Sequence, residues 1–203
     1  DGGPPAGRRI LVGVEAGHGD MIPFCRYCDQ LKAAGAARVG VLCHPGLVAL
    51  FSSLRGADEI MPLDRPFERA DWDVWVAPLS LPLHFRTTVD TVPAALPYLA
   101  PDRARSVRLA PLLAAAPDEM KIGLVWKGNP RFDNDAARSL PGLATLAPLL
   151  RVRGVRWFSL QKGPGEDEAK EGVVDLAPAI DDFADTAALI AGLDLVITVD
   201  TAC

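Results

Sequence analysis

Short apolar, β-branched runs recur along the chain and alternate with amphipathic stretches at helical spacing. The run at residues 10–14, ILVGV, is broken only by Gly13 and leads into a Gly-rich turn over residues 15–19. An apolar run bounded by turn residues is typical of a strand that is buried on both faces. The amphipathic pattern over residues 20–34 predicts the first helix, which Gly35 ends.

The same alternation continues to the end of the chain. Further strands are expected at residues 38–43, 59–63, 73–76, 121–126, 155–160, 173–176 and 193–199. Helical segments are expected at residues 45–54, 79–85, 103–116, 143–150 and 183–191, with another beginning at Asp200 and Thr201. Strands that alternate with helices in this way predict parallel sheets, so the fold class is α/β.

A stretch rich in Pro, Ala and Arg, residues 92–117, divides this pattern in two. We expect one Rossmann-like domain at residues 1–117 and a second at residues 118–203. The second cycle stops where a helix should cover its last strand, so we expect this domain to be incomplete. Strand 193–199 would then be partly uncovered, which favours aggregation.

Composition and charge narrow the class of protein. The chain has 203 residues, of which 49% are hydrophobic and 23% charged, as in ordinary globular proteins. A net charge of −5 without a basic stripe argues against a nucleic-acid binder. No apolar run reaches the roughly 18 residues of a membrane span, and the first residues lack a signal-peptide core.

Four cysteines are too few for a disulfide scaffold, so we expect reduced thiols in a cytoplasmic protein. Because the first residue is not Met, we expect a piece of a longer chain.

The motif Gly17-His18-Gly19-Asp20 follows the first strand directly. Ligands of open α/β folds bind at this rim of the sheet. Asp20 either serves only as the N-cap of its helix or acts as a general base that faces a cleft. In the second case the three preceding residues would contact the substrate. A dinucleotide fingerprint would need glycine at position 22, where Ile22 stands, and the chain has no Walker A sequence.

Cys25 and Cys28 form a C-x-x-C motif, which occurs in zinc and redox sites. Both thiols lie on the apolar face of the predicted helix, and no second C-x-x-C is present. We therefore expect them to pack in the core and expect no metal site.

Polar residues also follow three strands of the second half. The loop at residues 127–139 is long and rich in donors, which indicates either a phosphate or sugar site or a solvated surface loop. Residues after the next strands would reach the same crevice, and the predicted helix start at 200–201 would offer backbone N–H groups to an anion. The candidate ligand-binding residues are Lys127, Asn129, Arg138, Ser139, Gln161, Lys162, Asp200 and Thr201.

Four segments in this order, EAGHGDMIPFCRY, GLVWKGNPRFDNDAARSLP, FSLQKG and DFADTAALIAGLDLVITVDTA, carry a resemblance. From about Gly7 to Cys203 the chain resembles the glycosyltransferase family 9, or heptosyltransferase-like, proteins. More narrowly, it is similar to the bacterial branch in which this module follows tetratricopeptide repeats. The resemblance implies a glycosyltransferase-B fold, an acceptor on the first domain and a nucleotide-sugar donor on the second. It also implies an inverting reaction without metal or resident cofactor.

The resemblance implies roles for individual residues as well. Asp20 matches the general base of the family, and the loop from Lys127 and the pair Asp200-Thr201 match its donor side. Phe132 stands where His is frequent in this branch, and Cys28 where Ala is common. The family continues beyond the Asp-Thr pair with a helix and further strands, so we expect this chain alone to bind donor poorly and to turn over slowly or not at all.

We therefore expect glycosyl transfer from a nucleotide-diphosphate sugar to a glycan, lipid or protein acceptor. Such a transfer needs a base for the acceptor hydroxyl and donors that hold the departing diphosphate. Lys127, Arg138, Lys162 and the amides of Thr201 and Ala202 are candidates for the second task. The alternative is a non-catalytic module that binds a sugar nucleotide or a protein, and a weaker one is a nicotinamide-dependent enzyme.

Overall fold

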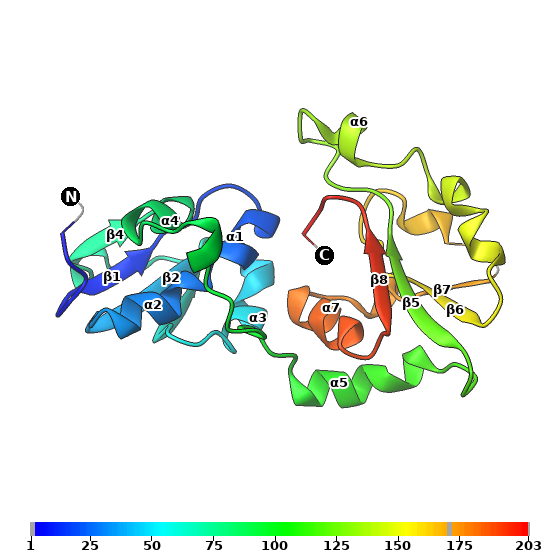
Figure 1. Ribbon diagram of the computed structural model, residues 1–203, viewed down its shortest axis with the longest axis horizontal. Helices are drawn as coiled ribbons and strands as arrows, with labels where there is room; N and C mark the ends of the chain where they lie inside the picture. The colour runs from blue at the N-terminus through cyan, green and yellow to red at the C-terminus, as the bar shows by residue number, and fades with distance from the viewer. Residues whose placement is uncertain (1–2, 170–171, 203) are drawn as a thin grey trace. The chain divides into compact units, whose positions relative to one another are not determined.

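The computed structural model of the chain describes residues 3–169 and 172–202. The chain divides into two compact units, residues 1–100 and 101–203. Each unit holds a four-stranded sheet in which every strand pairing is parallel (Figure 1). The prediction of two α/β units with parallel sheets is therefore confirmed.

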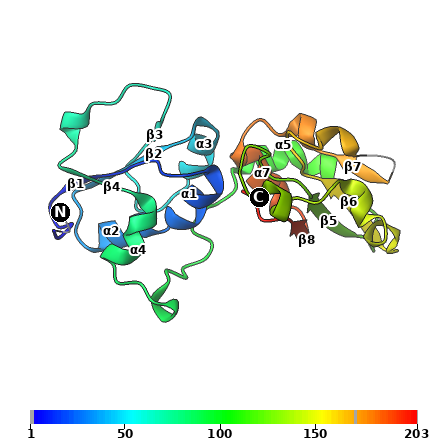
Figure 2. The same cartoon turned by 90° about the horizontal axis from the view of Figure 1, so that it is seen from above.

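The sheet of the first unit has the strand order β3-β2-β1-β4. Its strands are β1 (Arg9–Val12), β2 (Arg38–Cys43), β3 (Glu59–Pro62) and β4 (Val74–Val76). Its helices are α1 (His18–Phe24), α2 (Tyr27–Ala33), α3 (Val48–Phe51) and α4 (Leu81–His84). Figure 2 shows α2 and α4 on one side of this sheet and the connection from β3 to β4 on the other.

That connection places Trp72 over the sheet face formed by Leu11, Leu42 and Met61. A Cβ atom on Gly40 of β2 would lie 2.2 Å from the indole ring of Trp72. The absence of a side chain at Gly40 therefore lets the Trp72 ring approach the backbone of β2.

The predicted helix over residues 20–34 is in fact two helices, α1 and α2. Pro23 has no N–H for the helical ladder, and the thiol of Cys25 donates to the carbonyl of Ile22 at 2.9 Å. That carbonyl is the one that the next turn of a continuous helix would use. The first helix also begins earlier than predicted, at His18, so Gly17 is the N-cap and Asp20 lies in the first turn.

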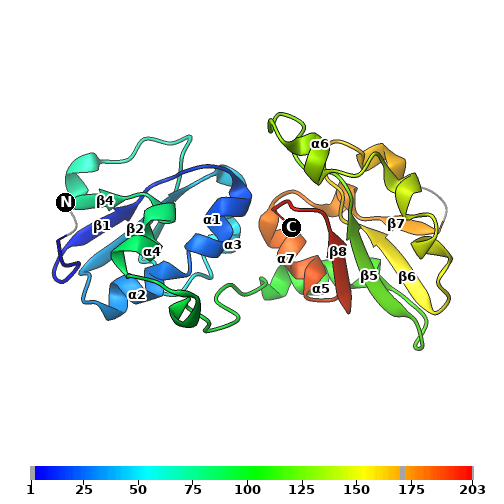
Figure 3. The same cartoon turned by 45° about the horizontal axis from the view of Figure 1, so that its top comes forward.

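The sheet of the second unit has the strand order β7-β6-β5-β8 (Figure 3). Its strands are β5 (Met120–Val125), β6 (Val155–Ser159), β7 (Val173–Asp175) and β8 (Leu195–Thr198). Its helices are α5 (Arg103–Leu109), α6 (Asp135–Arg138) and α7 (Phe183–Ile190). Alternate residues of β5 enter two different clusters, because Ile122 and Leu124 face one side of the sheet and Val125 the other.

The helix α5 lies alongside α7 (Figure 1). Arg105 and Arg108 both form ion pairs with Asp185 of α7, whose side chain is fully buried. Leu109 and Leu113 enter the core beneath that helix. Residues 101–117, which the sequence prediction grouped with the first domain, thus pack with the second unit.

Other elements differ in detail. The helix predicted at residues 143–150 is a pair of 3-10 turns, Leu143–Leu146 and Leu149–Arg151. The loop at residues 127–139 contains the short helix α6. Cys25 and Cys28 are buried, so the prediction that they pack in the core is confirmed. Within the described residues, no helix is long and apolar enough to cross a membrane.

Candidate functional site

Asp20 is exposed near the carboxyl end of β1, in the first turn of α1. Its Oδ2 atom accepts the backbone N–H of Gly17 at 3.0 Å. This bond satisfies one of the amides that a helix leaves unpaired at its start. Asp20 is thus not the N-cap itself, but its side chain caps the helix from within. A carboxylate held by one oxygen keeps lone pairs for a second partner.

A pair of histidines lies beside this turn. The rings of His18 and His44 stack with their centroids 4.4 Å apart, and Nε2 of His44 lies 3.0 Å from the carbonyl oxygen of Ala16. Burial, and then the proximity of His44, lower the pKa of His18. The sequence reasoning missed this contact, although His44 directly follows β2, the parallel neighbour of β1.

The turn after β1 is also tied to the segment after β4. Glu15 Oε2 accepts the backbone N–H of Leu79 at 3.2 Å, and Ala16 has a positive φ of 60°. The first sheet reverses its direction of growth between β1 and β4. Such a switch point is where open α/β sheets bind ligands. Gly17, His18, Gly19 and Asp20 all lie at this edge.

On the second unit, Gln161 occupies the centre of the corresponding edge. Its side chain is 1% exposed, and Oε1 accepts the N–H groups of Trp126 and Lys127 at 2.9 Å each. Its Nε2 atom donates to the carbonyls of Lys127 and Pro164 at 3.1 and 2.9 Å. These bonds make Gln161 a residue that positions the chain after β5, whereas the sequence predicted a ligand contact.

Lys127 lies at the start of this loop and is paired. Its Nζ atom lies 2.6 Å from Glu168 Oε1, and Glu168 Oε2 accepts the N–H of Leu143 at 2.7 Å. The ammonium group of Lys127 and then this N–H lower the pKa of Glu168. The sequence reasoning missed Glu168, which lies in the acidic run that follows Gly165.

Ser139 closes the loop at residues 127–139 onto itself. Its hydroxyl donates to Asp135 Oδ1 at 2.6 Å and accepts the N–H of Gly128 at 2.8 Å. A Cβ atom on Gly128 would lie 3.8 Å from the hydroxyl oxygen of Thr201. The end of β5 and the end of β8 therefore meet at Gly128.

Arg138 links the same loop to Asp200. Its Nη2 atom donates to the Asp200 carbonyl at 2.6 Å, and Nε lies 3.0 Å from Oδ2 of that residue. The guanidinium also lies 4.7 Å from the ring centroid of Phe132, in a cation–π contact. The ring of Phe132 thus packs against the guanidinium of Arg138.

Two further predicted ligand-binding residues, Lys162 and Asn129, bond to backbone groups of the second unit. Lys162 donates to the carbonyl of Ala177 at 2.8 Å, and Asn129 Oδ1 accepts the N–H of Arg131 at 3.1 Å. The structure describes the chain as far as Ala202, so the helix predicted to begin at Asp200 and Thr201 falls outside it. Over residues 3–169 and 172–202, no group of three or more His, Cys, Asp or Glu could hold a metal ion.

No family model matches the chain. It is 29% identical over 221 residues to Protein FlbA of Caulobacter vibrioides (strain ATCC 19089 / CIP 103742 / CB 15), an alignment that covers 94% of this chain and 36% of FlbA. The chain therefore spans about a third of the length of this curated relative.

Solved structures resemble the whole chain at low identity. The ADP-heptose LPS heptosyltransferase II of E. coli matches with a TM-score of 0.65 and 14% identity, over 96% of this chain and 80% of that one. A family 9 glycosyl transferase from Veillonella parvula DSM 2008 matches with a TM-score of 0.62 and 14% identity, over 94% and 75%. The E. coli heptosyltransferase WaaC with ADP matches with a TM-score of 0.53 and 15% identity, over 96% and 82%. These likenesses confirm the predicted glycosyltransferase-B fold.

Proposed function

We propose that the chain is the transferase module of an inverting, metal-independent glycosyltransferase. The observation that supports this most is the exposed carboxylate of Asp20 at the switch point of the first sheet, in a chain whose fold matches heptosyltransferases over 96% of its length. The donor would be a nucleotide-diphosphate sugar, and the acceptor a glycan, lipid or protein. As the resemblance implies, the module would follow tetratricopeptide repeats in a bacterial cytoplasmic protein.

Asp20 would act as the general base. Its carboxylate takes the proton of the acceptor hydroxyl while that oxygen bonds to the anomeric carbon and the bond from that carbon to the diphosphate breaks. The hydrogen bond from Gly17 holds one carboxylate oxygen in place and leaves the other to accept the proton. Gly17, His18 and Gly19 would contact the acceptor.

The donor would bind at the carboxyl edge of the second sheet. When the donor binds, Lys127 would exchange its ion pair with Glu168 for charge-assisted hydrogen bonds to the diphosphate. Arg138 would exchange its ion pair with Asp200 in the same way. The hydroxyls of Ser139 and Thr201, with Asn129 and Lys162, would serve the rest of the donor. Gln161 would keep the backbone of Lys127 in position.

The test is Asp20→Asn in the complete protein, assayed by release of nucleoside diphosphate from nucleotide sugars. We expect turnover to fall by about 10²–10⁴-fold, because the amide cannot accept the proton. Donor affinity should stay nearly unchanged. Asp64→Asn, at another exposed aspartate of the first unit, is the matched control and should keep full activity. Unchanged turnover in the Asp20 variant would remove Asp20 from the mechanism.

A non-catalytic sugar-nucleotide module is the second candidate. The pairing of Lys127 with Glu168 and of Arg138 with Asp200 is the observation behind it, because cations already held by carboxylates stabilise a departing diphosphate less, and only transfer needs that stabilisation. Donor binding without any release of nucleoside diphosphate, with every acceptor class tried, would support this candidate over transfer.

A further inference from the structure

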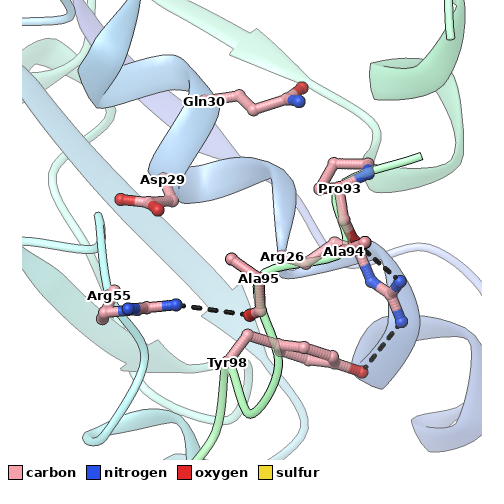
Figure 4. Close-up of a pocket in the computed structure, with 8 residues that line it drawn as sticks. All are labelled: Arg26, Asp29, Gln30, Arg55, Pro93, Ala94, Ala95 and Tyr98. Atoms are coloured by element: carbon pink, nitrogen blue, oxygen red, sulfur yellow. Dashed lines mark hydrogen bonds between the residues drawn. The ribbon is translucent and has the colours of Figure 1, made fainter. Parts of the chain in front are cut away.

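A pocket of about 200 Å³ lies in the first unit, between α2 and the segment at residues 93–98 (Figure 4). Arg26 and Gln30 line it from beyond the end of α1, whereas Asp20 lies in the first turn of that helix. The pocket is thus separate from the sheet edge described above. Its lining residues are Arg26, Asp29, Gln30, Arg55, Pro93, Ala94, Ala95 and Tyr98.

Two guanidinium groups are fixed at this pocket. Arg26 donates from Nη1 to the carbonyl of Pro93 at 3.1 Å and from Nη2 to the hydroxyl of Tyr98 at 3.3 Å, and its Cζ lies 4.6 Å from the Tyr98 ring centroid. Arg55 donates from Nη2 to the carbonyl of Ala95 at 3.3 Å. Figure 4 shows that both arginines reach toward the same segment. A guanidinium has five N–H donors, so these bonds hold the groups in place without using all of them.

The same pocket has one unpaired donor and one unpaired acceptor. Arg26 Nε and Gln30 Oε1 are buried and have no hydrogen-bond partner in the described part of the chain. Buried polar atoms are costly to leave unpaired. An occupant that brings both an acceptor oxygen and a hydroxyl donor would satisfy the two atoms at once.

Charge and size restrict the occupant further. Two arginines and one aspartate give the lining a net charge of +1. This charge suits a single carboxylate better than a phosphate monoester, which carries about −1.5 to −2. A volume of about 200 Å³ is below the roughly 300–1,000 Å³ of pockets that hold drug-sized ligands, so the occupant is small.

We propose that this pocket binds a small hydroxylated carboxylate, such as a hydroxy acid or a sugar acid. The carboxylate lies on Arg26, whose Nε has no partner within the described residues, a hydroxyl donates to Oε1 of Gln30, and Arg55 adds positive charge at the rim. This site does not depend on the role of Asp20, so the proposed transferase activity and this binding site can fail independently.

The probes are D-glucuronate and L-lactate, titrated into the 203-residue chain by calorimetry and by amide NMR. We expect at least one of them to bind saturably, with shifts of the amides of Gln30 and Tyr98. Glucose, which lacks the charge, and acetate, which lacks the hydroxyl, should bind at least tenfold more weakly. Saturable binding by neither probe, or equal binding by acetate, would overturn the proposal.

Gln30→Met removes the acceptor and keeps the length of the side chain. We expect it to weaken binding of the better probe at least tenfold and to leave the melting temperature unchanged or higher, because no protein bond is lost. Asp20→Asn should bind the probe like the wild type. A Gln30→Met variant that binds equally well would show that Gln30 serves only the packing of α2.

Discussion

Asp20 caps a helix with one oxygen and stays exposed at the sheet edge. One of its oxygens accepts the N–H of Gly17 and so stabilises the start of α1, while the carboxylate remains exposed at the end of β1. The sequence alone predicted the location of this carboxylate, because a polar residue after a buried strand must lie at the sheet edge. It did not predict the partner, since that depends on where the helix begins.

The pair of His18 and His44 predicts a dependence of stability on pH. The pKa of His18 in the folded protein is below its ordinary value of about 6.5, so the unfolded chain takes up the proton more readily. The free energy of unfolding should therefore decrease as the pH falls through about 6.5. Urea unfolding between pH 7.5 and 5.5 measures this slope.

His18→Asn should make that slope shallower, and His84→Asn, at an exposed histidine of α4, should not. An identical slope in wild type and in the His18 variant would contradict this account of the histidine pair.

The buried thiols predict low reactivity. Burial raises the pKa of Cys28 and of Cys43 to about 12, and it also raises the pKa of Cys25. Because the thiolate is the reactive form, these groups should react slowly with a disulfide reagent at pH 8 in the native protein and quickly in urea. A Cys203→Ser background restricts the readout to these three residues. Rapid native reaction of Cys25 or Cys28 would instead indicate a redox or metal role for the C-x-x-C motif.

Gln161 shows that the position of a residue at a sheet edge is easier to predict than the direction of its side chain. Its place after β6 is typical of a ligand contact, yet its amide bonds to the backbone of Lys127 and Pro164. A position at the end of a strand does not determine whether the side chain turns inward or outward. The acidic partners Glu168 and Asp135 were missed for the same reason.

Among the secondary-structure elements, the strands β1, β2 and β5 were predictable because parallel strands buried on both faces appear as unbroken apolar runs. The division between α1 and α2 was not, because nothing in the apolar pattern of residues 20–34 marks the turn at Cys25 and Arg26. The 3-10 geometry at residues 143–151 was likewise invisible in the apolar pattern.

The contact between α5 and α7 predicts a loss of stability when Asp185 is substituted. Asp185 is fully buried, pairs with Arg105 and Arg108, and accepts the N–H of Asp181 at 3.0 Å. Burial opposes its charge, but that N–H and the guanidinium groups outweigh burial and lower its pKa. Asp185→Asn should therefore lower the free energy of unfolding by about 3 kcal/mol. Asp181→Asn, at the exposed neighbour, should cost less than about 0.5 kcal/mol. Equal, small effects of both variants in urea unfolding would contradict the structural role of Asp185.

At the scale of the whole molecule, each unit has its own sheet and its own core. The residues that join them belong with the second unit, because α5 supplies Arg105, Arg108 and Leu109 to the packing around α7. The sequence pattern placed the division at 117/118. The residues of a helix beside a Pro-rich stretch do not indicate which of the two sheets the helix will pack against.

Two separately expressed pieces test this division. Residues 101–203 should fold cooperatively, as judged by NMR dispersion and circular dichroism. Residues 118–203 lack α5 and should be less stable or unfolded, because Asp185 loses both cations. Equal stability of the two pieces would restore the division at 117/118.

The most direct test of glycosyl transfer is the release of nucleoside diphosphate by the full-length protein. It is incubated with a panel of nucleotide-diphosphate sugars and with glycan, lipid and protein acceptors, beside its Asp20→Asn variant. We expect release with at least one donor and a loss of about 10²–10⁴-fold in the variant. Absence of release with every donor, or equal release by both proteins, would contradict it.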